Sequence, residues 1–265
     1  EVVGWRPPRK WALQRSADPN HRGECGGTAL HAASRGGHAE MVRLLCEVGA
    51  ERDATRSDGA TALFLAVHDG LLEVARGLTA ARADVNVAWQ DGATPLFVAA
   101  QSGDIGLVLE LHAAGAAVSQ ATRTGSTPLL IAAQQGHSEV VGFLCAGMAD
   151  VDSALHSGAT PLLMAAQGGH VDIAAALCGA RASVDAPTET GSTPLVVAAQ
   201  HGHLGVARLL CGAQADITCA RLDGATAALV AMNSGHRAMV YLLREISMRR
   251  AAPPRSGKGG GKGKG

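Results

Sequence analysis

Apolar residues come in paired short runs along most of this chain, and glycines bound each pair. In the stretch "GSTPLLIAAQQGHSEVVGFLCAG", residues 125 to 147, the first run is rich in Leu and Ala and follows Thr127 and Pro128. A threonine N-cap with proline at the first helical position starts a helix, and Gly136 ends it by accepting a left-handed backbone. In the second run, two valines and a leucine fall at helical spacing. The pattern predicts two short helices, followed by a turn of small residues.

The same pattern returns every 33 residues. The phrase "GATPLFVAAQSGD" at 92–104 is nearly copied as "GATPLLMAAQGGH" at 158–170. Seven threonines mark the successive units: Thr28, Thr61, Thr94, Thr127, Thr160, Thr193 and Thr226. Because a unit of two short helices cannot bury its apolar face alone, neighbouring units must stack. We therefore predict an all-α solenoid of helix-turn-helix units with loops or β-turns at their tips.

The repeated phrase also resembles a known family. Thr-Pro-Leu-x-x-Ala-Ala-x-x-Gly-His, with endings such as "RADVNVAWQDG", is similar to the ankyrin repeat, over residues 24 to 246 in seven units. The histidine that the family places after Thr-Pro-Leu is kept only as His31. Apolar residues take its place in the other units: Phe64, Phe97, Leu130, Leu163, Val196 and Leu229. Gly77 and Glu110 replace an expected leucine of the second helix, so we expect the stack to be weakest there.

Two end segments flank the repeats. In residues 1–23, "SADPN" lies in register with "RADVN" two units later. This segment is either a diverged cap or the remnant of an earlier unit in a longer array. Residues 247–265 form a basic tail rich in Gly and Lys, which we expect to be disordered because it has no apolar surface to bury.

Charge is spread unevenly although the net charge is zero. Residues 248–265 carry +6, residues 1–23 carry +3, and the repeats between them carry −9. Nucleic acid binding along the repeats is therefore disfavoured, because phosphate neutralisation needs a basic stripe. Binding to nucleic acid or to an anionic membrane surface through the tail stays open. The sequence shows no membrane-spanning stretch and no secretory signal.

The cysteines and histidines do not indicate a metal or a disulfide. Four cysteines occupy one repeat position, Cys46, Cys145, Cys178 and Cys211. Equivalent positions in adjacent units lie about 8–10 Å apart, beyond the reach of a disulfide or of zinc. We expect packed, reduced thiols and a reducing compartment, cytoplasmic or nuclear. By the family resemblance, His137, His170, His203 and His236 are structural and tie each turn to its neighbour.

No motif for catalysis or for a cofactor is present in the sequence. It lacks a Gly-x-Ser-x-Gly elbow, a phosphate-binding loop and a His-Glu-x-x-His helix. We expect no enzyme activity, no cofactor and no metal. One modification is expected from the resemblance: Asn86, eight residues after Leu78, has the spacing at which ankyrin repeats are hydroxylated on asparagine. The alternative is that Asn86 only favours the turn.

The function expected from the resemblance is protein binding by a monomeric scaffold. In ankyrin-like stacks, the loop tips and the exposed flank of each first helix form one concave groove. The candidate partner-binding residues are Arg56, Trp89, Gln90, Arg123, Leu155, His156, Glu189 and Arg221 at the loop tips, and Gln101, Gln134, Gln167 and Gln200 on the helix flank. We expect Trp89 to be the anchor, because tryptophan dominates interface hot spots. The alternative is a regulatory fragment of a larger protein, such as a ligase or an acyltransferase.

Overall fold

The chain forms a stack of helix pairs. The structure, a computed structural model, describes residues 18–251. The first helices of the units make one column: α2 (Ala29–Arg35), α4 (Ala62–His68), α6 (Pro95–Ser102), α8 (Pro128–Gln135), α10 (Pro161–Gly168), α12 (Pro194–His201) and α14 (Ala227–Asn233). The second helices make the other: α3 (Ala39–Glu47), α5 (Leu72–Ala80), α7 (Ile105–Ala113), α9 (Ser138–Ala146), α11 (Val171–Gly179), α13 (Leu204–Gly212) and α15 (Arg237–Ala251).

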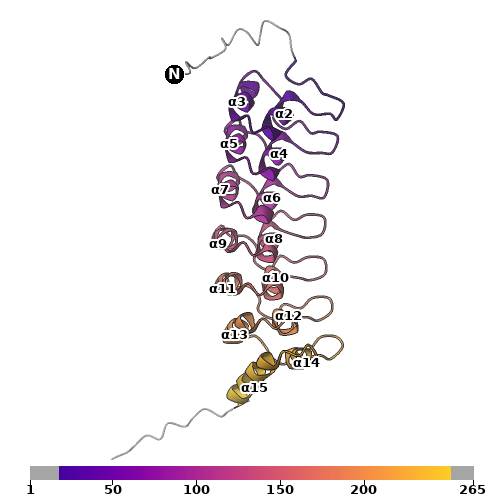
Figure 1. Ribbon diagram of the computed structural model, residues 1–265, viewed down its shortest axis with the longest axis vertical. Helices are drawn as coiled ribbons and strands as arrows, with labels where there is room; N and C mark the ends of the chain where they lie inside the picture. The colour runs from indigo at the N-terminus through magenta and orange to yellow at the C-terminus, as the bar shows by residue number, and fades with distance from the viewer. Residues whose placement is uncertain (1–17, 252–265) are drawn as a thin grey trace, which may run out of the picture.

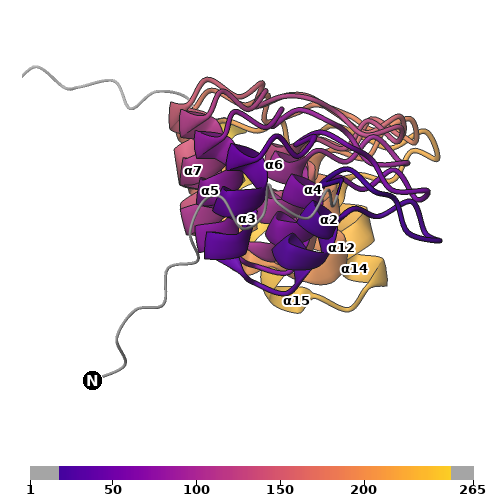
Figure 2. The same ribbon diagram turned by 90° about the horizontal axis from the view of Figure 1, so that it is seen from above.

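The two columns lie side by side, and the loops before the first helices all project to one side (Figure 1). Seen from above, these loops lie over one another as a continuous layer (Figure 2). Within residues 18–251, extended structure is limited to two isolated β-bridges, Thr55 with Thr61 and Ala220 with Thr226. The prediction of an all-α helix-turn-helix solenoid is confirmed.

The first helix of each unit begins as the sequence predicts. In the fourth unit, Thr127 Oγ1 accepts the backbone N–H of Leu130 at 3.3 Å, and Pro128 occupies the first helical position. Gly136 ends the helix with a φ of +87°, a conformation that costs little only for glycine. These start and stop signals recur in the neighbouring units, so the helices are short and the loops leave at the same place in each repeat.

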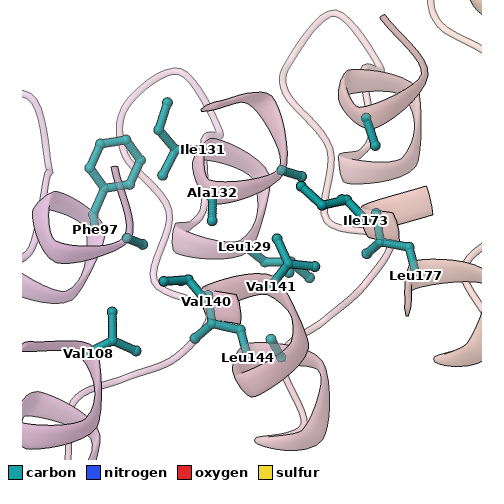
Figure 3. Packing of buried hydrophobic residues seen from close by; sticks show 14 of the residues in the cluster. Phe97, Val108, Leu129, Ile131, Ala132, Val140, Val141, Leu144, Ile173 and Leu177 are labelled. Carbon is teal, nitrogen blue, oxygen red and sulfur yellow. The ribbon is translucent and has the colours of Figure 1, made fainter. Parts of the chain in front are cut away.

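The core is a thin apolar layer between the two columns. Leu129 and Ala132 of α8 are fully buried, and they pack with Val140 and Leu144 of α9 (Figure 3). Burying one such leucine stabilises the fold by about 1.5–3 kcal/mol relative to leaving it in water. Each layer also contacts the layers above and below, so the core is continuous along the stack.

A ladder of side-chain hydrogen bonds joins neighbouring units through the turns that follow the second helices. One residue per unit accepts the backbone N–H of the residue 31 positions later, at 2.7–3.1 Å. The acceptors of this ladder are Asn20, Asp53, Asn86, Ser119, Asp152 and Asp185. Because Asp, Asn and Ser all serve, the position requires a short acceptor and no particular charge.

Asn20 makes the first bond of this ladder. Its Oδ1 accepts the N–H of Glu51 at 2.7 Å, and its Nδ2 donates to the carbonyl oxygen of Gly49 at 3.4 Å. Asn86 makes the same two contacts with Ala117 and Gly115. The segment before the first complete unit thus contacts that unit as a repeat does, while residues 1–17 lie outside the described residues.

The last helix is longer than the sequence predicts. α15 continues to Ala251, so the expected boundary after residue 246 falls inside a helix. The guanidinium of Arg250 donates to the carbonyl oxygen of Cys211 in the last turn of α13 at 3.0 Å and to that of Ala215, just beyond α13, at 2.8 Å. This contact ties the end of α15 to the unit before it, and residues 252–265 of the expected tail lie outside the described part. No helix between residues 18 and 251 combines the length and hydrophobicity of a membrane span.

The polar substitution in the second helices is accommodated by a local network. Glu110 on α7 accepts a hydrogen bond from the Thr79 hydroxyl at 2.6 Å and one from the Arg76 Nε at 3.4 Å, both on α5. Gly77 faces Val42 without a close contact. Hydrogen bonds from Thr79 and Arg76 to Glu110 thus join α5 and α7 where an apolar contact was expected. Lower stability of the stack at this place stays a prediction.

Candidate functional site

The loops that project from the stack are tight hairpins, which we call fingers and number by unit. Each finger spans five residues, and the N–H of its first residue donates to the carbonyl oxygen of its fifth at 2.8–3.0 Å. The fingers are residues 23–27, 56–60, 89–93, 122–126, 155–159, 188–192 and 221–225. A backbone hydrogen bond inside each finger fixes its shape, so residue identity at the tip is free to vary.

Backbone hydrogen bonds also join most neighbouring fingers. The donor in each case is the second residue of a finger, and the acceptor is the third residue of the finger before it. These bonds are Ser57 to Cys25 at 3.1 Å, Arg123 to Asp91 at 2.8 Å, His156 to Thr124 at 3.3 Å, Glu189 to Ser157 at 3.0 Å and Leu222 to Thr190 at 3.0 Å. The equivalent bond from Gln90 to Asp58 is missing among residues 18–251. Fingers two and three are therefore the exception in an otherwise regular row.

A cleft of about 810 Å³ opens beside this exception. It lies between fingers three to five and the first helices α4, α6 and α8. Phe64, Phe97 and Ile131 form its apolar floor, and Figure 3 shows Phe97 and Ile131 on the side of their helices that faces away from α7 and α9. Trp89 forms one wall, with its ring 5.3 Å from that of Phe64 and 36% of its surface exposed.

The rim of the cleft is polar. Gln101 and Gln134 stand on the helix side, and Arg123 and His156 stand on the finger side. His68 also lines the cleft, and its Nδ1 lies 2.9 Å from the carboxylate of Asp69. An apolar floor with a few polar groups at its edge is the usual composition of a binding cleft.

The glutamine ladder is exposed, but only half of it belongs to the cleft. Gln101, Gln134, Gln167 and Gln200 each stand on the exposed flank of a first helix. Their side-chain amides form no hydrogen bond within residues 18–251. Their backbone carbonyl oxygens are occupied in three units, because His137, His203 and His236 approach Gln101, Gln167 and Gln200 with Nε2 at 3.0–3.1 Å. The structural role predicted for these three histidines is confirmed.

The predicted loop-tip residues divide into two groups. Trp89, Arg123, Leu155 and His156 line the cleft. Four others do not line it: Arg56, Gln90, Glu189 and Arg221. Arg56 and Arg221 form ion pairs inside their own fingers, with Asp58 at 3.3 Å and Asp223 at 3.5 Å. The structure thus brings together the middle of the predicted groove.

The floor of the cleft was not among the predicted binding residues. Phe64, Phe97 and Ile131 are missing from the candidates at the loop tips and on the helix flank, yet all three line the cleft. For two of them the sequence does carry a signal: phenylalanine replaces the family's histidine in the second and third units, and both rings line the cleft.

Asn86 lies in the acceptor ladder. Its side chain binds Gly115 and Ala117 and is half-buried, so the turn alone gives this residue a role. Hydroxylation of Asn86 stays a prediction; an intact mass of the native protein without one added oxygen atom on Asn86 contradicts it.

The cysteines have the environment of packed thiols. All six are free, and burial raises the pKa of Cys46, Cys145, Cys178 and Cys211. Raised thiol pKa values keep the sulfur protonated and unreactive at neutral pH. In residues 18–251, no three His, Cys, Asp or Glu side chains gather as metal ligands do.

A stack of helix pairs that presents fingers and an open cleft on one side defines a helical repeat scaffold. The family described as "Ankyrin repeats (3 copies)" matches residues 9–88, 78–154 and 147–221. The ankyrin repeat domain of Bcl-3, described as a unique member of the IkappaB protein family, superimposes with a TM-score of 0.75 at 27% identity, over 83% of this chain and 100% of that one. This chain belongs to the ankyrin repeat family.

One curated relative matches a short segment. Protein phosphatase 1 regulatory subunit 27 of Homo sapiens is 42% identical over 50 residues, which are 19% of this chain. The match spans about a third of that relative's length, 32%. The likeness to this relative is therefore confined to a short segment of each chain.

Proposed function

We propose that this protein is a non-catalytic scaffold that binds a protein partner through the cleft between fingers three to five and helices α4, α6 and α8. The observation that carries the proposal is the half-exposed indole of Trp89, which stands over an apolar floor formed by Phe64 and Phe97. An exposed tryptophan beside an apolar cleft is the usual centre of an interface hot spot.

The comparisons support the same class of function. Bcl-3 is named as a member of the IkappaB protein family, and the human relative is named as a regulatory subunit of protein phosphatase 1. The second name describes a protein that works together with another protein. The net charge of −9 over residues 24–247 favours a protein partner over nucleic acid along the stack.

A neutral, bulky substitution in the cleft tests this proposal. Gln134→Trp fills the cleft from the exposed flank of α8, and Gln200→Trp places the same side chain at the equivalent position of α12, outside the cleft. Partners captured by the wild-type chain should be retained by Gln200→Trp and lost by Gln134→Trp, with circular dichroism unchanged in both. Equal retention by both variants would reject the cleft as the binding site.

We also propose that the protein works in a reducing compartment. The four stacked cysteines are packed with raised thiol pKa values, and none of the six is paired. Titration of anaerobically prepared, denatured native protein should count all six thiols. A lower count, restored by reductant, contradicts this proposal.

A further inference from the structure

Fingers two and three are held apart by side chains. A methyl group added to Gly92 would lie 3.2 Å from the backbone nitrogen of Arg123, because finger four packs directly on finger three. The same addition to Gly59 meets only side-chain atoms, Gln90 Cγ at 3.6 Å and Trp89 Cδ1 at 3.8 Å. The side chains of finger three therefore fill the space that backbone fills elsewhere.

This separation leaves two backbone groups unpaired next to Trp89, on fingers two and three, although neither Gln90 nor Asp58 lines the cleft itself. Neither the N–H of Gln90 nor the carbonyl oxygen of Asp58 has a hydrogen-bond partner within residues 18–251. Both groups are paired at the other finger junctions described above. A donor and an acceptor on neighbouring loops are what the main chain of an extended peptide requires for recognition.

The cleft also carries a cation without a partner. Arg123 is exposed, and within residues 18–251 its guanidinium forms no ion pair or hydrogen bond. The arginines of fingers two and seven, by contrast, pair with an aspartate of their own finger. The carboxylate of Asp91, which also lines the cleft, accepts the N–H of Ala93 at 2.9 Å within finger three and keeps its negative charge. Because Asp91 forms no ion pair with Arg123 within residues 18–251, the guanidinium of Arg123 is free to pair with a carboxylate of a partner.

We propose that the cleft binds an extended acidic peptide segment of the partner. A large apolar side chain of the segment enters beside Trp89 and Phe64, and a carboxylate one or two residues away pairs with Arg123. The main chain of the segment bonds to the Gln90 N–H and the Asp58 carbonyl oxygen. A volume of about 810 Å³ is enough for one or two large side chains. This inference rests on the proposed function and specifies the chemistry of its partner.

Selection from a random displayed peptide library tests the charge. The full chain should enrich peptides that combine a large apolar residue with Asp or Glu. Arg123→Glu should reverse the selected charge to Lys or Arg, whereas Arg221→Glu, on a finger outside the cleft, should leave the consensus unchanged. A consensus without acidic residues, or one that Arg123→Glu does not alter, overturns the inference.

A proline substitution tests the main-chain contact. Gln90 is the second residue of the finger-three turn, a position that accepts proline. Proline there removes the N–H together with the glutamine side chain, and Gln90→Ala controls for the loss of the side chain. Gln90→Pro should weaken the selected peptides about two- to tenfold, the usual effect of one hydrogen bond, while Gln90→Ala should not. Equal affinity of the two variants overturns the main-chain part of the inference.

The same peptides separate this inference from the proposed function. If Gln134→Trp abolishes their binding but Arg123→Glu and Gln90→Pro do not change it, the cleft binds peptides of another chemistry, and only the inference fails. If Gln134→Trp has no effect on any selected peptide, the proposed function fails as well.

Discussion

Two regions of the concave face carry different surface residues on similar helices. The first is its middle, units two to four, and the second is its C-terminal part, units five and six. Leu96 and Leu195 are equivalent and both fully buried. At the surface, Trp89 of the middle corresponds to Thr188, and Phe97 corresponds to Val196. The C-terminal fingers are joined by backbone hydrogen bonds, whereas fingers two and three are not. The repeat thus specifies the fold in both regions, and departures from the repeat create the cleft in only one.

The largest expected effect concerns what the two regions share. Leu96→Ala and Leu195→Ala each remove a fully buried leucine, and each should lower the free energy of unfolding by about 2–5 kcal/mol. Urea unfolding of the two variants measures this. Similar losses support a uniform fold; a small loss for Leu96→Ala alone would show that the middle of the stack is loosely packed.

A smaller effect is expected at the acceptor ladder. Asn86→Ala and Asp185→Ala each remove one hydrogen bond between neighbouring units, so each should cost about 1 kcal/mol in thermal or urea unfolding. Asn86→Asp should cost little, because Asp53 and Asp152 serve at the same position. A large loss for Asn86→Asp would mean that the amide has a role beyond this ladder.

The smallest expected effect is a pH dependence of stability that is confined to the first unit, where His31 stands. His31 is buried in the first unit. Its Nδ1 accepts the N–H of Thr28 at 3.1 Å, and its Nε2 lies 3.2 Å from the carbonyl oxygen of Ala60. Burial lowers the pKa of His31. Because the pKa is lower in the folded state, folding favours the neutral ring of His31. The contribution of His31 to the free energy of unfolding is therefore fully present above the ordinary pKa of about 6.5, and it is lost as the pH falls below that value.

Hydrogen exchange measures this local effect. Protection of α2 and α3 should fall between about pH 7.5 and pH 5.5 more in the wild-type chain than in His31→Leu, since leucine stands at this position in later units. Protection of α10 and α11 serves as the internal control. An equal pH response of the two proteins in α2 and α3 would contradict a role for the His31 pKa.

Much of the fold was predictable because each unit carries its own start and stop signals. Thr127, Pro128 and Gly136 predict the bounds of α8, and the 33-residue period then predicts the stacking of all the units. The end of α15 was not predictable, because Arg250 there contacts the carbonyl oxygens of Cys211 in α13 and of Ala215 just beyond it. That contact follows from the stack and leaves no pattern in the sequence.

The candidate site was predictable in part. Trp89 and Arg123 were recognised from the loop positions, and the structure places both at the cleft. The missing bond between Gln90 and Asp58 was not predictable, because it results from how the Trp89 ring packs on Phe64. Residues that face a neighbouring unit are set by three-dimensional packing, which a one-dimensional period does not contain.

The affinity of a cleft-binding peptide or partner for Trp89→Ala and Thr188→Ala tests the central claim most directly. These residues hold the same place in fingers three and six, but only Trp89 lines the cleft. With helical content unchanged, Trp89→Ala should weaken binding by about 2 kcal/mol or more, the usual loss at a hot spot, and Thr188→Ala should leave binding as it is. Equal affinities of the two variants, or a larger loss for Thr188→Ala, would contradict the claim that the middle of the concave face is the binding site.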